Sequence, residues 1–560
     1  MKFNQVTIAI VTALTVIVGC SESMNDPTQT TPQQESSRIQ EEQEELVELE
    51  VMDATNTLPA APTTKMAHSR VAANHQFMVM PMPGIDPYIQ TENRDNYLDT
   101  PSNATKLVTA SPLSTFSIDV DTGSYANVRS YLKMGNKPPA DAIREEAFIN
   151  YFDYAYPTPA TKARPFSVST ELAPAPWNVE RKIMRIALKG YDIPANERKA
   201  SNLVFLVDVS GSMNEPNKLP LLVQSLSLLA KNLGEKDKVS LVTYAGNSSV
   251  VLEPTSGDNQ QAIVDALKSL QAGGVTYGES GIKLAYRQAK KGFIKDGVNR
   301  VVLATDGDFN VGVTSLDALK DLVEDERQKG ISLTTLGFGR GNYNDAMMEQ
   351  LANIGDGNHA YIDTLHEAQK VLLRQMSGTL QSIAEDVKIQ VEFNPDTVKE
   401  YRLIGYQNRK LRDEDFNNDK VDAGEIGAGH TVTALYELTL VGDQGRIDDL
   451  RYQQQKTDAA SHSDELAQVK VRYKLPGKDK SQLTTQVITG SKGKPTFTQA
   501  SAGFQFAIAV AAFAQKLKDN HYVDGLAYSQ IADIARENRG KDPFNYRGEF
   551  ITLVEIAQNL

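Results

Sequence analysis

The chain has 560 residues, with 58 basic and 71 acidic side chains, a formal net charge of −13 and one cysteine. The acidic surplus disfavours nucleic acid as a partner, because it repels phosphate. The single cysteine excludes an intrachain disulfide and a thiolate zinc site, and the length suggests about three or four domains.

The first residues have the pattern of a secretory signal. Lys2 supplies a positive charge, residues 6–18 form an apolar stretch, and the tetrapeptide IVGC ends at Cys20. This end resembles the lipobox of bacterial lipoproteins, which implies that the Cys20 thiol is acylated and that the signal is cut just before it. Ser21 stands where that family uses aspartate for inner-membrane retention, so we expect a lipid anchor at the outer membrane. A plain secretory signal with an incidental cysteine is the alternative.

Residues 21–85 are rich in Pro, Gln, Thr, Ser and Glu and nearly lack aromatic residues. Such a segment buries too little surface to offset the entropy of ordering it. We therefore predict a disordered tether with a root-mean-square span on the order of 45 Å, which holds the folded part away from the membrane.

The next segment, residues 86–197, is predicted to form helices and then strands. Its stretch Asp121-Thr122-Gly123-Ser124 looks like the D-T-G-[ST] signature of aspartic proteases. Such an enzyme needs two of these aspartates sharing one proton, and the chain has no second D-T-G or D-S-G. We interpret the stretch as a structural turn, with Asp119 and Asp121 facing the same side of a strand. An aspartic protease remains an alternative.

Between residues 198 and 383, buried apolar runs alternate with amphipathic stretches. This alternation predicts an α/β fold, a doubly wound and mostly parallel sheet with right-handed crossovers. The expected strands are 202–208, 239–244, 300–305, 331–338 and 359–362, and the expected helices are 219–233, 262–270, 281–291, 316–329, 344–354 and 365–381.

Polar residues follow the carboxyl ends of these strands, where ligands bind in such sheets. Asp208, Ser210 and Ser212 follow the first strand, Thr276 lies before the 281 helix, and Asp306 follows the strand that ends at 305. All five offer hard oxygen donors, which favours Mg²⁺ or Mn²⁺ over zinc or copper. The alternative is a set of helix caps. Neighbouring Asp308 is interpreted as a loop acid.

This constellation resembles the metal-ion-dependent adhesion site of von Willebrand factor type A domains, whose motif is D-x-S-x-S, then a distant Thr, then a distant Asp. The resemblance implies that Ser210 and Ser212 bind the metal directly and that Thr276 does so when a ligand is bound. It also implies that Asp208 and Asp306 act largely through water. An acidic group of a protein partner would complete the coordination.

Strand-like alternation returns after the central domain, for example at 387–393, 431–440 and 468–475. We expect one β-sandwich built from strands on both sides of an inserted type A domain. Residues 413–419 lack the spacing of a calcium loop and are interpreted as a solvated acidic loop. The resulting domains are 1–20 signal peptide, 21–85 tether, 86–197 N-terminal flank, 198–383 type A domain, 384–500 β-rich region and 501–560 helical region.

The whole order resembles a bacterial lipoprotein family with a type A domain. We therefore expect a non-enzymatic protein that binds a protein partner through Mg²⁺ and the membrane through lipidated Cys20. A hydrolytic enzyme, either D-T-G protease or metal hydrolase, and a metal-independent structural scaffold are the alternatives.

Overall fold

The computed structural model describes residues 94–159, 161, 164–276, 278–307, 316–375, 378, 380–448, 464–490 and 496–560. The predicted signal, Cys20, the tether and Asp308 lie outside this description. Among the described residues, none of the helices combines the length and apolar character that crossing a bilayer requires. All of them belong to one compact unit, Tyr88–Leu560.

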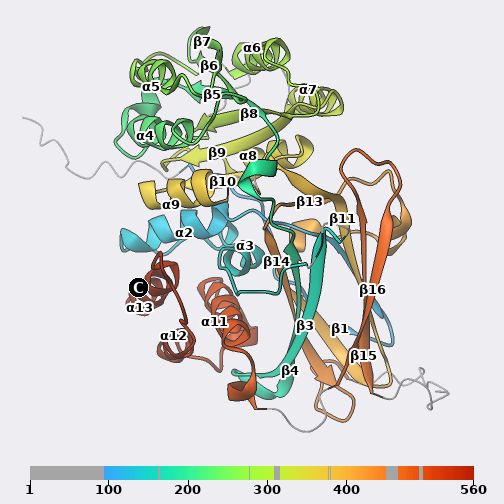
Figure 1. Ribbon diagram of the computed structural model, residues 1–560. Coiled ribbons are helices and arrows are strands. Elements are labelled where there is room, and N and C mark those ends of the chain that lie inside the picture. The colour runs from blue at the N-terminus through green and yellow to red at the C-terminus, as the bar shows by residue number, and fades with distance from the viewer. Residues whose placement is uncertain are drawn as a thin grey trace, which may run out of the picture. The chain divides into compact units, whose positions relative to one another are not determined.

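A six-stranded sheet forms the core of the central domain, in the order β10-β9-β8-β5-β6-β7 (Figure 1). All neighbouring strands pair in parallel except β6 and β7. The α/β prediction is thus confirmed, and an antiparallel edge strand is added. The strands are β5 (Ser201–Asp208), β6 (Lys238–Tyr244), β7 (Ser248–Ser256), β8 (Val298–Thr305), β9 (Ser332–Phe338) and β10 (His359–Ile362).

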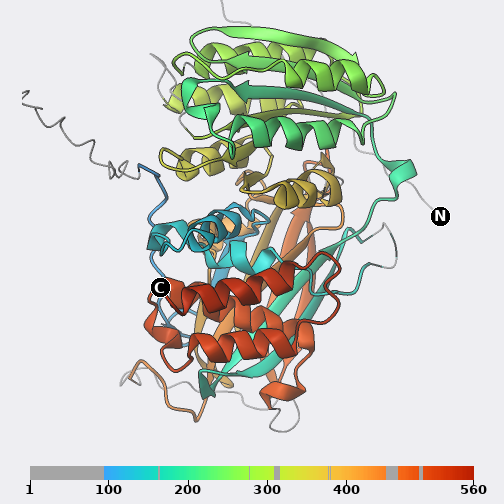
Figure 2. The same cartoon turned by 90° about the vertical axis from the view of Figure 1, so that its left-hand side faces the viewer.

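Helices cover both faces of this sheet (Figures 1 and 2). In β5, Phe205 faces one set of helices and Leu206 faces the other, because successive strand side chains point to opposite faces. The first set is α4 (Leu219–Ala230), α5 (Gln260–Lys268) and α9 (Leu365–Gln369), and the second is α6 (Gly278–Lys291), α7 (Leu316–Gln328) and α8 (Asp345–Ile354).

The closing helix is shorter than the predicted range 365–381. After α9 the chain widens into one π-helical turn, η4 (Lys370–Arg374), in which the Gln375 N–H donates to the Lys370 carbonyl at 3.0 Å. Single π turns of this kind are rare and are frequently found at functional positions.

Two antiparallel sheets form a sandwich, as predicted. The first has the order β1-β12-β14-β4-β3, and in it β4, before the central domain, pairs with β14, after it. The second joins β13, β11, β15 and β16, with β2 also on β11. The strands are β1 (Lys106–Leu107), β2 (Leu113–Ser117), β3 (Phe166–Ala175), β4 (Asn178–Gly190), β11 (Ser382–Phe393), β12 (Val398–Ile404), β13 (Gly424–Gly427), β14 (Thr431–Leu440), β15 (Glu465–Lys474) and β16 (Gln482–Thr489).

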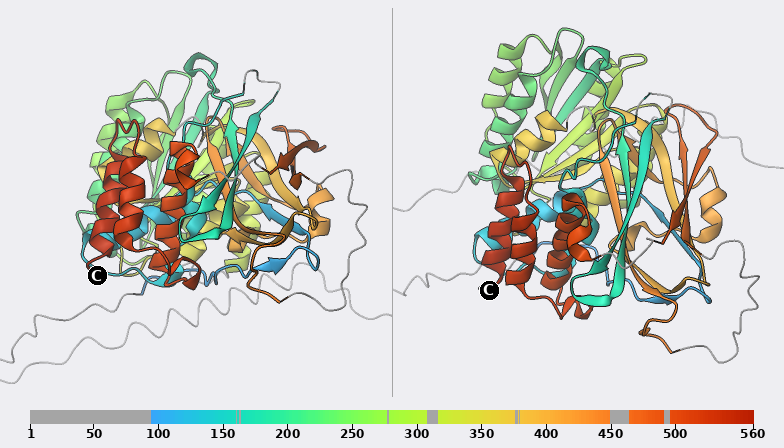
Figure 3. Two further views of the ribbon diagram at one scale, coloured as in Figure 1. Left: turned by 90° about the horizontal axis from the view of Figure 1, so that it is seen from below. Right: turned by 60° about the horizontal axis from the view of Figure 1, so that its bottom comes forward.

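A helical layer covers the outer face of the first sheet (Figures 1 and 3). Along β4, Ile186 faces the sandwich interior, whereas Ile183 and Ala187 face the helices. This layer is α2 (Gly123–Lys133), α3 (Glu145–Asn150), α11 (Ala502–Leu517), α12 (Tyr528–Glu537) and α13 (Tyr546–Ala557). The remaining short helices are η1 (Ala140–Ala142), η2 (Ala195–Glu197), η3 (Gly211–Asn214), η5 (Gln407–Arg409), η6 (Asp413–Asn417), η7 (Phe497–Gln499) and η8 (His521–Val523).

Buried ion pairs join the central domain to this layer. Arg144, just before α3, pairs with Asp345 and with Glu349 of α8, the latter at 3.0 Å. Arg129 of α2 pairs with Asp363 and, at 2.8 Å, with Glu367 of α9. Each arginine is 1% exposed, so these carboxylates, rather than water, compensate its buried charge.

We expect Arg144→Met to lower the free energy of unfolding by about 3–5 kcal/mol, because Asp345 would remain buried without its arginine and Glu349 would keep only Arg409. Chemical denaturation measures the loss. Arg412→Met is the matched control, since the Arg412 side chain is 73% exposed, and it should unfold like the wild type. Equal midpoints for the two variants would show that the buried pair is not needed.

Candidate metal centre

Asp208 ends β5 and is fully buried. Its carboxylate accepts hydrogen bonds from the Ser210 N–H at 2.9 Å, the Thr305 hydroxyl at 2.9 Å and the Tyr244 hydroxyl at 3.1 Å. Burial raises the pKa of Asp208 to about 6, against the lowering effect of the Ser210 hydrogen bonds and with a further rise from Asp306. The side chain is thus oriented from three elements.

The two serines of the motif lie together. Their Oγ atoms are 3.0 Å apart, because η3 turns the chain immediately after Ser210. The loop of Thr276 is bonded to the same turn: the Gly211 N–H donates to the Gly274 carbonyl at 3.0 Å. Thr276 itself is half-buried, two residues beyond Gly274.

Asp306 is buried beside this turn and accepts a hydrogen bond from the Lys218 ammonium at 3.1 Å. Lys218 is 3% exposed and stands directly before α4. Gly307 follows with φ +93°, and a Cβ there would lie 2.3 Å from the Asn344 backbone nitrogen. The chain can therefore turn sharply after Asp306 only with glycine at this position.

The structure thus brings together Asp208, Ser210, Ser212 and Asp306, and it bonds the loop of Thr276 to them. These residues fit a divalent cation, because two buried carboxylates face one ammonium and leave a negative charge to neutralise. Every candidate ligand is a hard oxygen donor. The sequence interpretation missed three supporting residues, Lys218, Tyr244 and Thr305. In the sequence, these three residues are marked only by being polar residues at the end of a buried helix or strand.

The stretch from Asp121 to Ser124 does not form part of a strand, which corrects the expected placement of Asp119 and Asp121: β2 ends at Ser117. The Asp121 carboxylate accepts the His359 N–H at 2.9 Å, and burial beside Asp119 raises its pKa. The Ser124 hydroxyl donates to the Ala142 carbonyl at 2.6 Å. These contacts explain why these residue types occur here, at a junction between two parts of the fold.

Gly123 starts α2 directly against the central domain. A Cβ on Gly123 would lie 2.9 Å from His359 Nε2, so this junction admits no larger residue without a shift of the imidazole. The glycine of the D-T-G stretch is therefore explained by the close approach of α2 to β10.

A separate acidic cluster, Asp356, Asp422 and Glu425, brings carboxylate oxygens within 4.8 Å of one another. Arg327 already pairs with Asp356 at 2.9 Å and with Asp422 at 2.8 Å. The cluster is explained by this arginine and by solvent. We do not interpret it as a metal site.

Comparisons with known proteins identify the domain in which this candidate site lies. Family models match as follows: von Willebrand factor type A domain at residues 202–375, von Willebrand factor at 91–185 and "Uncharacterized protein YfbK, C-terminal" at 378–560. The Escherichia coli K12 protein YfbK is 46% identical over 480 residues, covering 84% of this chain and 83% of YfbK. This chain belongs to the YfbK family. Its central domain is a von Willebrand factor type A domain, a class that generally mediates protein–protein interaction and commonly binds a divalent metal.

More distant relatives share only parts of the YfbK-type chain. Human inter-alpha-trypsin inhibitor heavy chain H3 is 24% identical over 43% of this chain and 28% of its own length. The solved von Willebrand factor type A protein from Catenulispora acidiphila is 14% identical, covers 67% of this chain and 88% of its own, and has a TM-score of 0.38.

We expect Lys218→Met to lower the free energy of unfolding in EDTA by about 3–5 kcal/mol, because Asp306 would lose its buried cation. Added Mg²⁺ should recover more stability in this variant than in the wild type. Urea unfolding with and without Mg²⁺ measures both effects, with Lys291→Met, whose side chain is 59% exposed, as control. An unchanged midpoint in EDTA would show that Lys218 does not neutralise Asp306.

Proposed function

We propose that this chain is a lipid-anchored, extracytoplasmic binding protein that engages a protein partner through Mg²⁺ or Mn²⁺ held at the candidate metal centre. The observation that carries the proposal is the convergence of Asp208, Ser210, Ser212 and Asp306 at the carboxyl ends of β5 and β8. The proposed function is binding, which requires no catalytic nucleophile.

In this proposal the hydroxyls of Ser210 and Ser212 hold the ion, Asp208 and Asp306 orient its water ligands, and Thr276 joins when the partner binds. When bound, the ion supplies an electrophilic position for a carboxylate of the partner. Val275, beside Thr276, is 63% exposed and offers an apolar contact next to that carboxylate.

The charge of the chain limits how such a partner is attracted. A net charge of −13 repels an acidic protein at long range. The ion and the ammonium of Lys218 would therefore supply the local attraction. High salt should weaken this binding little, because the contact is short-ranged and partly buried.

The metal centre is tested by titrating the full chain with Mg²⁺ in a calorimeter. Asp208→Ala and Ser212→Ala should each lower the affinity at least about tenfold, which corresponds to about 1.4 kcal/mol. Asp317→Ala is the control, because the Asp317 side chain is 88% exposed on α7, and its affinity should equal that of the wild type. Normal Mg²⁺ binding by Asp208→Ala would refute the site.

The partner is sought by crosslinking and pull-down from membranes, with and without EDTA, comparing wild type with Asp208→Ala. A partner that is lost both in EDTA and in the variant supports metal-dependent binding. Capture that EDTA leaves intact supports the alternative of a structural scaffold.

The anchor is tested by Cys20→Ser in the producing cell. Wild-type protein should sediment with membranes and incorporate labelled palmitate, whereas the variant should do neither, since each acyl CH₂ buried in lipid contributes about 0.8 kcal/mol. Palmitate labelling of the variant, or membrane sedimentation equal to that of the wild type, would contradict a lipid anchor at Cys20.

A further inference from the structure

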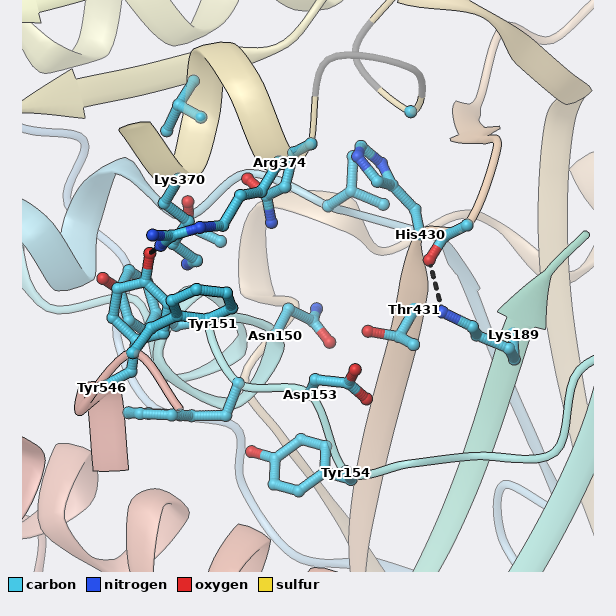
Figure 4. Close-up of a pocket in the computed structure, with 18 of the residues that line it drawn as sticks. Asn150, Tyr151, Asp153, Tyr154, Lys189, Lys370, Arg374, His430, Thr431 and Tyr546 are labelled. Carbon is cyan, nitrogen blue, oxygen red and sulfur yellow. Dashed lines mark hydrogen bonds between the residues drawn. The ribbon is translucent and has the colours of Figure 1, made fainter. Parts of the chain in front are cut away.

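A cavity of about 760 Å³ lies where the type A domain meets the helical layer and the sandwich. Lys370 and Arg374 of η4, Tyr151 after α3, Tyr546 of α13 and His430 before β14 are among the residues that line it (Figure 4). Its volume falls in the range of about 300–1,000 Å³ that small-molecule sites occupy. None of the five residues of the candidate metal centre lines it.

Lys370 is the unusual feature of this cavity. It is 5% exposed, its nitrogen lies 2.9 Å from the centroid of the Tyr151 ring, and that nitrogen has no hydrogen-bond acceptor among the described residues. The nearby Glu367 carboxylate is already bonded to Arg129 and to the Tyr151 hydroxyl, at 2.8 and 2.6 Å. A buried ammonium without an acceptor is costly, so an anion beside Lys370 would stabilise its charged form.

The charge state of Lys370 responds to its surroundings. Burial lowers its pKa to about 7, Glu367 and Glu549 oppose this effect, and Arg129 and Arg374 add to it. The rings of Tyr151 and Tyr546 and the neutral imidazole of His430 complete its surroundings. A bound anion would favour the protonated form of Lys370.

Other side chains near Lys370 can also contact an anion. Both ring nitrogens of His430 have no hydrogen-bond partner in the described part of the chain, and burial lowers the pKa of His430 to about 4, so it is neutral and can donate one N–H. Arg374 is exposed and stacks on the Phe544 ring, 3.4 Å from its centroid. The charged residues of the wall are Lys189, Lys370, Arg374, Lys541 and Arg547 against Asp121, Asp153, Asp192 and Asp542.

Two of those acids are already engaged inside the protein. Asp121 accepts the His359 N–H, and Asp542 accepts from Arg539 at 3.0 Å. Of the cations, Lys189 donates to the Gly429 carbonyl at 2.6 Å and Arg547 to the Asp153 carbonyl at 2.7 Å. The five basic and four acidic side chains of the wall leave one formal positive charge, on a chain whose net charge is −13. Its aromatic walls add an apolar surface that a bare inorganic ion would leave uncovered.

We propose that this cavity binds a small organic anion, whose carboxylate or phosphate lies between Lys370 and Arg374 while its apolar or aromatic body packs against Tyr546. Lys370 then gains the acceptor that the protein does not provide. Arg374 closes the mouth of the site from the same π-helical turn.

The test is calorimetric titration of the full chain with benzoate, phenyl phosphate and, as a cation of similar size, benzylamine. Benzoate or phenyl phosphate should bind, which distinguishes a carboxylate from a phosphate site, and benzylamine should not. Lys370→Met should weaken binding at least about tenfold. Lys283→Met, with a side chain 50% exposed on α6, should bind like the wild type. Thermal unfolding checks that both variants fold.

Benzoate provides a second readout, because its charge is constant between about pH 6 and pH 8 while Lys370 titrates. Its affinity for the wild type should be about tenfold higher at the lower pH, and Lys370→Met should abolish that difference. Failure of both anions to bind, equal affinity in the folded Lys370→Met protein, or preferential binding of benzylamine would overturn the proposal.

Discussion

Buried arginines hold the type A domain in one position against the rest of the fold. Arg144 meets Asp345 and Glu349 of α8, and Arg409 meets Glu349 at 3.4 Å and Asp119 at 3.0 Å. Burial alone would raise the pKa of Asp345, yet Arg144 and His359 hold that pKa well below its usual range. Because a buried charge tolerates no loss of its partner, these pairs permit little sliding between α8 and the helical layer.

The two candidate sites depend on this interface to different degrees. Lys370 follows directly on α9, whose Glu367 is fixed by Arg129, so the cavity exists only where the domain is seated on the helical layer. The candidate metal centre lies at the carboxyl ends of β5 and β8 and is assembled wholly within the type A domain. The same chain thus carries one site internal to a domain and one made by the junction of its parts.

The apolar periodicity of the sequence made the central sheet predictable. The exposed strands lack that periodicity and were hard to predict. β5 and β8 are continuous apolar runs, so their ends and the positions of Asp208 and Asp306 could be read from sequence. β7 and β16 have few buried residues and lack the apolar pattern. Lys218 could not be assigned, since its partner Asp306 is 88 positions away. The D-T-G-S stretch was predicted to be a turn, and the structure places it at the start of α2, in a contact with His359 that spans 238 positions.

Three buried cations differ in whether the protein itself provides their counter-charge. This difference distinguishes a structural role from a binding role. Arg144 has its carboxylates within the protein, so its charge is compensated without a ligand. Lys218 shares its carboxylate with a site that still carries excess negative charge, which a divalent metal ion would neutralise. Lys370 lies over the Tyr151 ring and has no hydrogen-bond acceptor among the described residues. Since a desolvated charge costs several kcal/mol unless it is compensated, the three cations match different proposed complements: none for Arg144, a metal ion beside Lys218 and an organic anion at Lys370.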